Sequence, residues 1–414
     1  MAHVLLLSLV FRPDNVSTAQ LMADLAEGLQ SLGHTVTVVT SKAHYNPDRA
    51  AEAAQPRKKV WFGLLTRSSY RGMTVYHAWM PRKGVNKIYR IVTWLGFHAV
   101  TTLASCVHVP RPQVVVAPSP PLTIGLSAWL IARFHRSRYI YNVQEIYPDV
   151  AINLGVVKSR RLINTLLRLE KFIYKKAAAV SVISCRMRDR LLEKGVAPEK
   201  LALIPNFVDV GQFVPMERDN EFSRRHGFTG KFLISYAGNM GKPQHLETLL
   251  YAAAELLLDA RIHFLLMGSG SEVPVLRDLV TKLKLKNVTF LDQQPYEIMP
   301  QAYAAADAAY VPQAIGTSAD GVPSKVYRIM SAARGVIAST DKGSDLDHLI
   351  TAASCGVVLT THDPLALADV IRSAMGDVTA WRQRGANGRK HVLGVYDRTI
   401  VIGQYDSLVR AVTQ

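Results

Sequence analysis

Two stretches of this chain, one in each half, repeat the same order of a buried strand, a polar loop and an amphipathic helix. In the first half, residues 3–11 are apolar, residues 12–17 are polar, and leucines recur at helical spacing through residues 21–32. In the second half, residues 232–237 are apolar, a glycine loop follows, and leucines recur again from Leu246. Strands that alternate with helices form a parallel sheet with helices on its faces. The repeat therefore predicts an α/β chain with two doubly wound, Rossmann-like domains.

The length of the chain agrees with this division, because 414 residues exceed what one typical hydrophobic core accommodates. We expect an N-terminal domain over residues 1–208 and a C-terminal domain over residues 209–390. Residues 391–414 should form a C-terminal helical segment that packs back on the first domain. Ligands of such sheets bind at the carboxyl ends of the strands, so we expect the two domains to face one another across a cleft.

A turn and a short helix near the end of the chain carry an unusual set of side chains. Asp320 precedes a glycine in the turn, and Pro323 suits the first position of a helix. Ser324 and Lys325 follow, and Arg328 lies three residues further on the same helical face. The unpaired amides at a helix start attract anions, so this segment suits a diphosphate. An ordinary capped helix explains the same residues equally well.

Two glycine loops follow strands of the second half and supply further candidates for that site. Gly238 and Gly268 each stand at a predicted strand end, where a missing side chain lets backbone approach a phosphate. The spacing of a Rossmann dinucleotide loop is absent after both first strands, which disfavours a nicotinamide or flavin dinucleotide. The loops therefore indicate a nucleotide-diphosphate site, with candidate binding residues Gly238, Asn239, Lys242, Gln244, Gly268, Ser324, Lys325 and Arg328.

Acidic residues follow a strand of the first half. Gln144 and Glu145 come directly after the apolar residues 139–143, and Asp149 follows a proline. Glu145 could orient a sugar hydroxyl or act as a general base. For Asp149, a role in the turn is at least as well favoured.

No histidine or cysteine cluster has the spacing of a metal site, so we expect neither a metal nor a cofactor. Three scattered cysteines fit a reducing cytoplasm. Residues 1–11 lack a basic segment and a cleavage site and are predicted as a strand, not a signal peptide. No apolar run reaches the roughly 18–20 residues of a membrane span.

The net charge of +17 is confined to the first half of the chain. Residues 1–200 contain 28 Lys and Arg against 11 Asp and Glu, whereas residues 201–414 contain 21 of each. Within residues 51–100, a single acid, Glu52, opposes nine basic residues that alternate with aromatic ones: Arg57, Lys58, Lys59, Arg67, Arg71, Arg82, Lys83, Lys87 and Arg90.

Such a surface could serve solubility, bind nucleic acid or contact an anionic membrane. The mostly apolar run 87–107 has a basic start, as an interfacial helix does. This run favours the membrane over nucleic acid. We therefore expect a peripheral protein on the cytoplasmic face of the plasma membrane.

Several motifs together resemble those of family 4 glycosyltransferases of the GT-B fold. The chain is similar over nearly its whole length to the branch of colanic-acid and O-antigen fucosyl- or N-acetylfucosaminyl-type transferases. The matching segments are residues 33–40, 114–121, 143–149, 193–209, 237–244 and 322–325.

The chain departs from the family pattern at three places. The family's pair of glutamates falls on Asp320 and Arg328, so the second acid is replaced by a base. The Arg and Lys that grip the diphosphate in the family fall on Asn239 and Gln244, and its His-Asp pair falls on Gln144 and Glu145. Lys242, Lys325 and Arg328 could supply the missing positive charge.

The resemblance implies a retaining transferase that moves a sugar from a nucleotide-diphosphate donor to a lipid-linked saccharide, without a metal. Glu145, Asp320 and Lys325 are the catalytic candidates. Two rivals stay open: an epimerase of the same fold that acts on the nucleotide sugar, and a binding protein without catalysis. An epimerase needs no lipid acceptor, so the basic aromatic segment counts against it.

Overall fold

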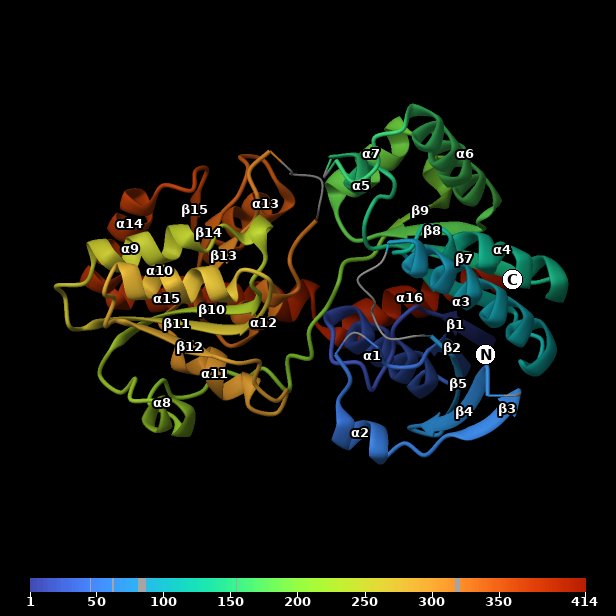
Figure 1. Ribbon diagram of the computed structural model, residues 1–414, viewed down its shortest axis with the longest axis horizontal. Coiled ribbons are helices and arrows are strands. Elements are labelled where there is room, and N and C mark those ends of the chain that lie inside the picture. The colour runs from blue at the N-terminus through green and yellow to red at the C-terminus, as the bar shows by residue number, and fades with distance from the viewer. Residues whose placement is uncertain (45, 62, 81–86, 154, 317–320) are drawn as a thin grey trace. The chain divides into compact units, whose positions relative to one another are not determined.

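The computed structural model describes residues 1–414 except residues 45, 62, 81–86, 154 and 317–320 and the side chains of residues 50 and 87–92. The chain forms two compact units (Figure 1). Unit 1 contains Met1–Asn206 together with Thr399–Gln414, and unit 2 contains Phe207–Arg398. The last segment of the chain therefore belongs to the unit that holds the first.

Unit 1 is built on a sheet of nine strands in its described residues, in the order β3-β4-β5-β2-β1-β6-β7-β8-β9. The pairs β3–β4 and β4–β5 are antiparallel, and the other described pairs are parallel, so β4 alone among the described strands runs against the rest. The central strands are rich in valine and isoleucine, which suit a pleated, buried surface. The strands are β1 (His3–Leu7), β2 (Thr35–Ser41), β3 (Lys58–Trp61), β4 (Leu65–Tyr70), β5 (Met73–Ala78), β6 (Val114–Pro118), β7 (Arg138–Val143), β8 (Ala179–Val182) and β9 (Leu201–Leu203).

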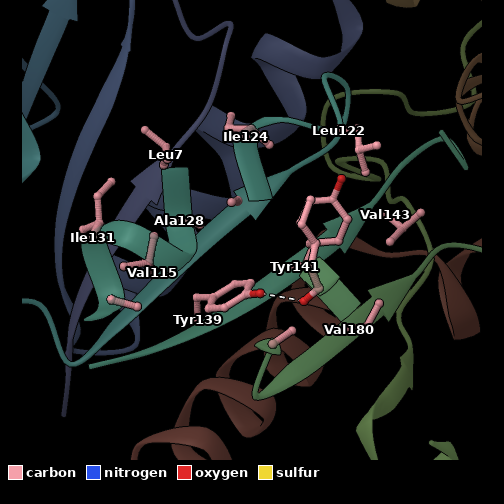
Figure 2. Close-up of a cluster of buried hydrophobic side chains, with 14 of the residues drawn as sticks. Leu7, Val115, Leu122, Ile124, Ala128, Ile131, Tyr139, Tyr141, Val143 and Val180 are labelled. Carbon is pink, nitrogen blue, oxygen red and sulfur yellow. Dashed lines mark hydrogen bonds between the residues drawn. The ribbon is translucent and has the colours of Figure 1, made fainter. Parts of the chain in front are cut away.

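Helices cover the sheet of unit 1: α1 (Ser17–Ser31), α2 (Arg49–Ala53), α3 (Lys87–His108), α4 (Ile124–His135), α5 (Asp149–Asn153), α6 (Arg160–Lys176), α7 (Cys185–Glu193), the 3-10 helix η1 (Pro198–Lys200) and α16 (Arg398–Thr413). Figure 2 shows part of the core, where Tyr139 and Tyr141 of β7 lie among aliphatic residues of β6 and α4. The hydroxyl of Tyr139 donates a hydrogen bond to the carbonyl of Ile173 in α6 (2.6 Å). Helix α16 packs on α1, where Gly28 leaves room for the side chain of Ile402.

Unit 2 is built on six described strands in the order β12-β11-β10-β13-β14-β15. All its strand pairs are parallel, so the carboxyl ends of the strands share one edge. The strands are β10 (Phe232–Asn239), β11 (Ile262–Ser269), β12 (Val288–Leu291), β13 (Ala308–Pro312), β14 (Gly335–Ser339) and β15 (Gly356–Leu359). The helices are α8 (Glu221–Arg225), η2 (Lys242–Gln244), α9 (Glu247–Glu255), α10 (Val273–Lys282), α11 (Met299–Ala305), α12 (Lys325–Ser331), α13 (Asp345–Ala353), α14 (Pro364–Gly376) and α15 (Val378–Val395).

Two buried clusters, one on each face, enclose this sheet. The prediction of two α/β domains with parallel sheets is confirmed. Among the described residues, no helix has the length and apolar content needed to cross a membrane.

Candidate functional site

The predicted glycine loops of unit 2 lie against one another. Strands β10 and β11 pair so that Gly238 is opposite Gly268. Both glycines have φ values near the edge of the left-handed region, +143° and +139°. A Cβ on Gly268 would lie 2.0 Å from the carbonyl oxygen of Gly238, and one on Gly270 would lie 2.1 Å from that of Met240. The two loops therefore touch through their backbones, which only glycine permits.

Lys325, the first residue of α12, places its ammonium beside this pair of loops. The Nζ atom lies 4.0 Å from the centroid of the Tyr236 ring, a cation–π contact. A Cβ on Gly238 would lie 3.2 Å from the same Nζ atom. The lysine side chain therefore occupies the space that the glycine leaves open.

The electrostatic surroundings of Lys325 leave its charge uncompensated. Burial lowers the pKa of the Lys325 ammonium to about 7. In the part of the chain that the structure describes, no carboxylate lies within ion-pair distance of Lys325. Lys325 is half-buried by accessible surface, and a partly desolvated cation without a described counter-charge is costly, so an anion that reached it would remove part of this cost.

The other predicted residues of the first glycine loop have different surroundings. Asn239 and Lys242 are exposed. The backbone carbonyl of Asn239 accepts a hydrogen bond from the Tyr236 hydroxyl (2.5 Å). The side chain of Gln244 accepts one from the amide of Gly241 (3.0 Å) and so helps to hold the loop.

Arg328 lies on α12 as predicted, but its described contacts are with aromatic rings. Its Cζ atom lies 5.5 Å from the centroid of Phe213 and 5.6 Å from that of Tyr296. Its guanidinium also hydrogen-bonds to the buried Tyr303. Among the described contacts, none joins Arg328 to the glycine loops.

Two predicted residues stand just before Lys325. Ser324 precedes α12, and its side chain makes no capping hydrogen bond to the helix. Asp320 lies outside the described residues.

In unit 1, Gln144 follows β7 and is held by hydrogen bonds on both sides of its amide. Its Nε2 donates to the side-chain oxygen of Asn142 (2.7 Å), and its Oε1 accepts from Asn206 (2.9 Å). Asn142 is fully buried and donates in turn to Tyr405 of α16 (2.5 Å) and to Ser181 (3.0 Å). These bonds connect β7, β8 and the last helix.

Glu145 follows in the same turn and is half-buried. The hydroxyl of Ser119 donates to the backbone carbonyl of Glu145 (3.1 Å) and accepts from the amide of Gln144 (3.1 Å). The backbone of the turn is therefore anchored to the loop after β6.

Asp149 takes part in ion pairs between helices. Its carboxylate lies 2.6 Å from Nζ of Lys194 and 2.9 Å from the guanidinium of Arg190. Lys194 also pairs with the buried Glu170 (2.8 Å), whose pKa is raised by burial. Asp149 therefore links α5 to α7.

The basic segment 51–100 is only partly described. Lys58 and Lys59 are exposed on β3, whereas Arg57 pairs with Glu52 (3.0 Å). Arg82 and Lys83 lie outside the described residues, and so do the side chains of Lys87 and Arg90.

Tyr236, whose ring contacts Lys325, was not among the predicted site residues. Its place two positions before a glycine at a strand end was the available signal. The aromatic rings around Arg328 gave no such signal, because they come from segments distant in the sequence. Within the described residues, no group of three His, Cys, Asp or Glu side chains could hold a metal ion.

These features define a two-domain α/β protein with glycine loops and a lysine at the strand ends of its second unit. Residues 18–206 match the glycosyl transferase 4-like domain, and residues 231–377 match the glycosyl transferases group 1 domain. The chain therefore belongs to the family 4 glycosyltransferases of the GT-B fold.

Two curated relatives come from bacteria. The glycosyltransferase WbjE of Pseudomonas aeruginosa is 27% identical over 63% of this chain and 66% of its own. A protein of Escherichia coli described as the colanic acid biosynthesis glycosyl transferase WcaI is 23% identical over 90% of this chain and 92% of its own. The chain is thus related to enzymes of bacterial polysaccharide synthesis.

Solved structures share the fold at lower identity. Anabaena HepE in complex with UDP and glucose superimposes with a TM-score of 0.75 at 14% identity, covering 99% of this chain and 100% of that one. WaaG, described as a glycosyltransferase of lipopolysaccharide biosynthesis, superimposes with a TM-score of 0.68 at 15% identity, covering 98% and 99%.

Proposed function

We propose that this protein transfers a hexosyl residue from a nucleotide-diphosphate sugar to a lipid-linked saccharide, in bacterial exopolysaccharide or O-antigen synthesis. The transfer retains the anomeric configuration and needs neither a metal nor a cofactor. The observation that carries the proposal is the Lys325 ammonium, which stands beside the Gly238 and Gly268 loops with no carboxylate partner among the described residues. Two relatives described as glycosyltransferases, one of them of colanic acid biosynthesis, support the reaction class.

The donor diphosphate is assigned to the carboxyl edge of the sheet in unit 2. The glycine loops leave backbone open to a phosphate, and Lys325 supplies the charge that opposes the departing diphosphate. Asn239, Lys242, Gln244 and Ser324 border the same loops. Arg328 contributes from the next turn of α12, where aromatic rings hold its guanidinium.

The acceptor is assigned to unit 1. Glu145 orients an acceptor hydroxyl or takes its proton, and the hydrogen bonds around Gln144 and Ser119 fix the turn that carries it. Asp320 is proposed to approach the donor sugar. The basic aromatic segment 57–107 holds the protein on the cytoplasmic face of an anionic membrane, where a lipid-linked acceptor is found. The structure of HepE with UDP and glucose supports a nucleotide-sugar donor for this fold.

The test is calorimetric titration of the full chain with UDP, GDP, ADP and the matching nucleosides. Loss of one charge-assisted phosphate contact costs about 1.5–3 kcal/mol. We therefore expect Lys325→Ala to weaken nucleoside diphosphate binding by about tenfold or more, with a smaller effect on the nucleoside. The matched control is Lys282→Ala, an exposed lysine of α10 that should change neither affinity. Equal losses for nucleotide and nucleoside would contradict the assignment.

A further inference from the structure

Helix α6 of unit 1 carries a dense group of basic residues that the charge of segment 51–100 does not include. Six of its residues are Lys or Arg, and its single acid, Glu170, is buried and paired with Lys194. Among the described residues, none of the six basic side chains forms an ion pair with a carboxylate. All six are exposed: Arg160, Arg161, Arg168, Lys171, Lys175 and Lys176.

Most of these charges lie on one face of the helix. Arg161, Arg168, Lys171 and Lys175 follow one another at intervals of seven, three and four residues, which are the intervals of helical neighbours. Like charges at such intervals repel and destabilise an isolated helix. The basic side chains of this face therefore repel one another, and a bound anionic partner would reduce that repulsion.

Apolar side chains are also exposed on α6 and in the turn before it. On α6 itself, Leu162 is 47% exposed and Leu167 is 37% exposed. The turn before the helix exposes Val156. A basic surface with exposed leucines suits the boundary between lipid headgroups and acyl chains.

The neighbouring helices extend the apolar surface. Trp129 of α4 packs edge-on against Phe172 of α6, with ring centroids 5.0 Å apart. His135 of α4 contacts the carbonyl of Ser105 in α3 (3.0 Å). Thus α3, α4 and α6 are joined side by side in unit 1 (Figure 1). Their exposed large apolar residues, among the described side chains, are Trp94, Leu95, Leu103 and Val107 of α3 and Leu130 and Phe134 of α4.

We propose that the basic face of α6, formed by Arg161, Arg168, Lys171 and Lys175, is the surface through which this protein binds anionic lipid headgroups. The proposal rests on the membrane association in the proposed function and moves its main electrostatic contact from residues 57–107 to α6. In the former segment, Arg57 is paired with Glu52, and Arg71 lies 4.0 Å from Glu27. A single-stranded nucleic acid is a poorer fit, because α6 exposes no aromatic side chain on which a base could stack.

Flotation with vesicles tests this surface. The full chain is mixed with vesicles of phosphatidylcholine and phosphatidylglycerol in equal parts, or of phosphatidylcholine alone. The variant is R168Q/K171Q/K175Q, because glutamine keeps helix propensity while it removes charge. Each basic residue near an anionic surface changes partitioning by about fivefold, so the triple variant should bind about a hundredfold more weakly.

Two controls separate position from net charge. K282Q/K284Q/K286Q removes three exposed charges from unit 2 and should float like the unmodified chain. K58Q/K59Q removes the exposed charges of β3 and should have a smaller effect than the α6 variant. Calorimetric binding of nucleoside diphosphate, measured on every variant, reports on the donor site independently of the membrane.

The proposal predicts flotation on anionic vesicles only, its loss in the α6 variant, and its loss at high salt, where screening shortens to about 3 Å. Equal flotation of the α6 and unit 2 variants would overturn it. Equal binding to neutral vesicles, or no flotation of the unmodified chain, would also overturn it. The same holds if the unmodified chain binds a DNA oligonucleotide and the α6 variant loses that binding. In each of these cases, the assignment of the donor site is still tested independently by the calorimetric binding of nucleoside diphosphate.

Discussion

Polar side chains at the carboxyl edges of the two sheets differ in how fully they are paired with neighbouring groups. In unit 2, Lys325 reaches the glycine loops and finds an aromatic ring but no carboxylate among the described residues. In unit 1, Gln144 is hydrogen-bonded on both sides of its amide, and Asp149 is held by two cations. Lys325 therefore has no described carboxylate partner, whereas Gln144 and Asp149 are occupied by hydrogen bonds and ion pairs within unit 1. A polar residue at a strand end is therefore a site candidate only to the extent that its neighbours leave it unsatisfied.

The largest effect should come from a methyl group in the glycine loops of unit 2. Gly268→Ala would place a Cβ 2.0 Å from the Gly238 carbonyl oxygen, at a φ of +139°. Because backbone must move, we expect the free energy of unfolding of unit 2 to fall by about 3 kcal/mol or more in chemical denaturation. Gly394→Ala, in α15 with open space around it, should be neutral or slightly stabilising. Similar values for both variants would show that the close approach of the loops is not needed.

Glu145→Gln tests whether the second edge also carries chemistry. Removal of a general base typically costs a hundredfold or more in rate, so turnover on the donor and acceptor pair should fall by about that factor. The affinity for nucleoside diphosphate should stay within about twofold, because the donor is assigned to unit 2. Glu193→Gln, an exposed acid of α7, is the matched control. Normal turnover of the Glu145 variant would leave unit 1 without a catalytic residue.

Asn142→Leu tests whether the polar network of unit 1 belongs to the fold. Leucine has the same number of side-chain heavy atoms but removes the hydrogen bonds that the buried Asn142 donates to Tyr405 and Ser181 and accepts from Gln144. We expect the free energy of unfolding to fall by about 2 kcal/mol, with donor affinity unchanged. Asn164→Leu, on the exposed face of α6, should cost less than about 0.5 kcal/mol. A loss of donor affinity in the Asn142 variant would contradict the assignment of this network to the fold of unit 1 and of the donor to unit 2.

The spacing of apolar residues predicted the central parallel strands of both sheets and the helix after the first strand of each, α1 and α9. It did not predict β3, β4 and β5 or most of the other helices. Strand ends of one parallel sheet share an edge, so the meeting of the Gly238 and Gly268 loops was also predictable. The contact of the last helix with α1, in which Ile402 fills the space beside Gly28, depends on residues at opposite ends of the chain. No local pattern contains such a contact.

The candidate site was predictable in its location but not in its detail. Lys325 and Arg328 share a helix, yet the rings around Arg328 come from Phe213, Tyr296 and Tyr303. The basic face of α6 had a readable signal in its spacing. Its significance depends on exposure and on the absence of described acid partners, which become visible only in the folded chain.

The central claim is our proposal that Lys325, which has no carboxylate partner among the described residues, binds the donor diphosphate. The pH dependence of nucleoside diphosphate binding tests it most directly. With a pKa of about 7 in the free protein, Lys325 loses its proton as the pH rises, and a bound diphosphate raises that pKa. Calorimetry in buffers of different ionisation enthalpy should therefore show proton uptake on binding and an affinity about tenfold lower at pH 8.5 than at pH 7. Lys325→Met should abolish both effects. Equal affinity at the two pH values without proton uptake, or a pH dependence that survives in Lys325→Met, would contradict the account.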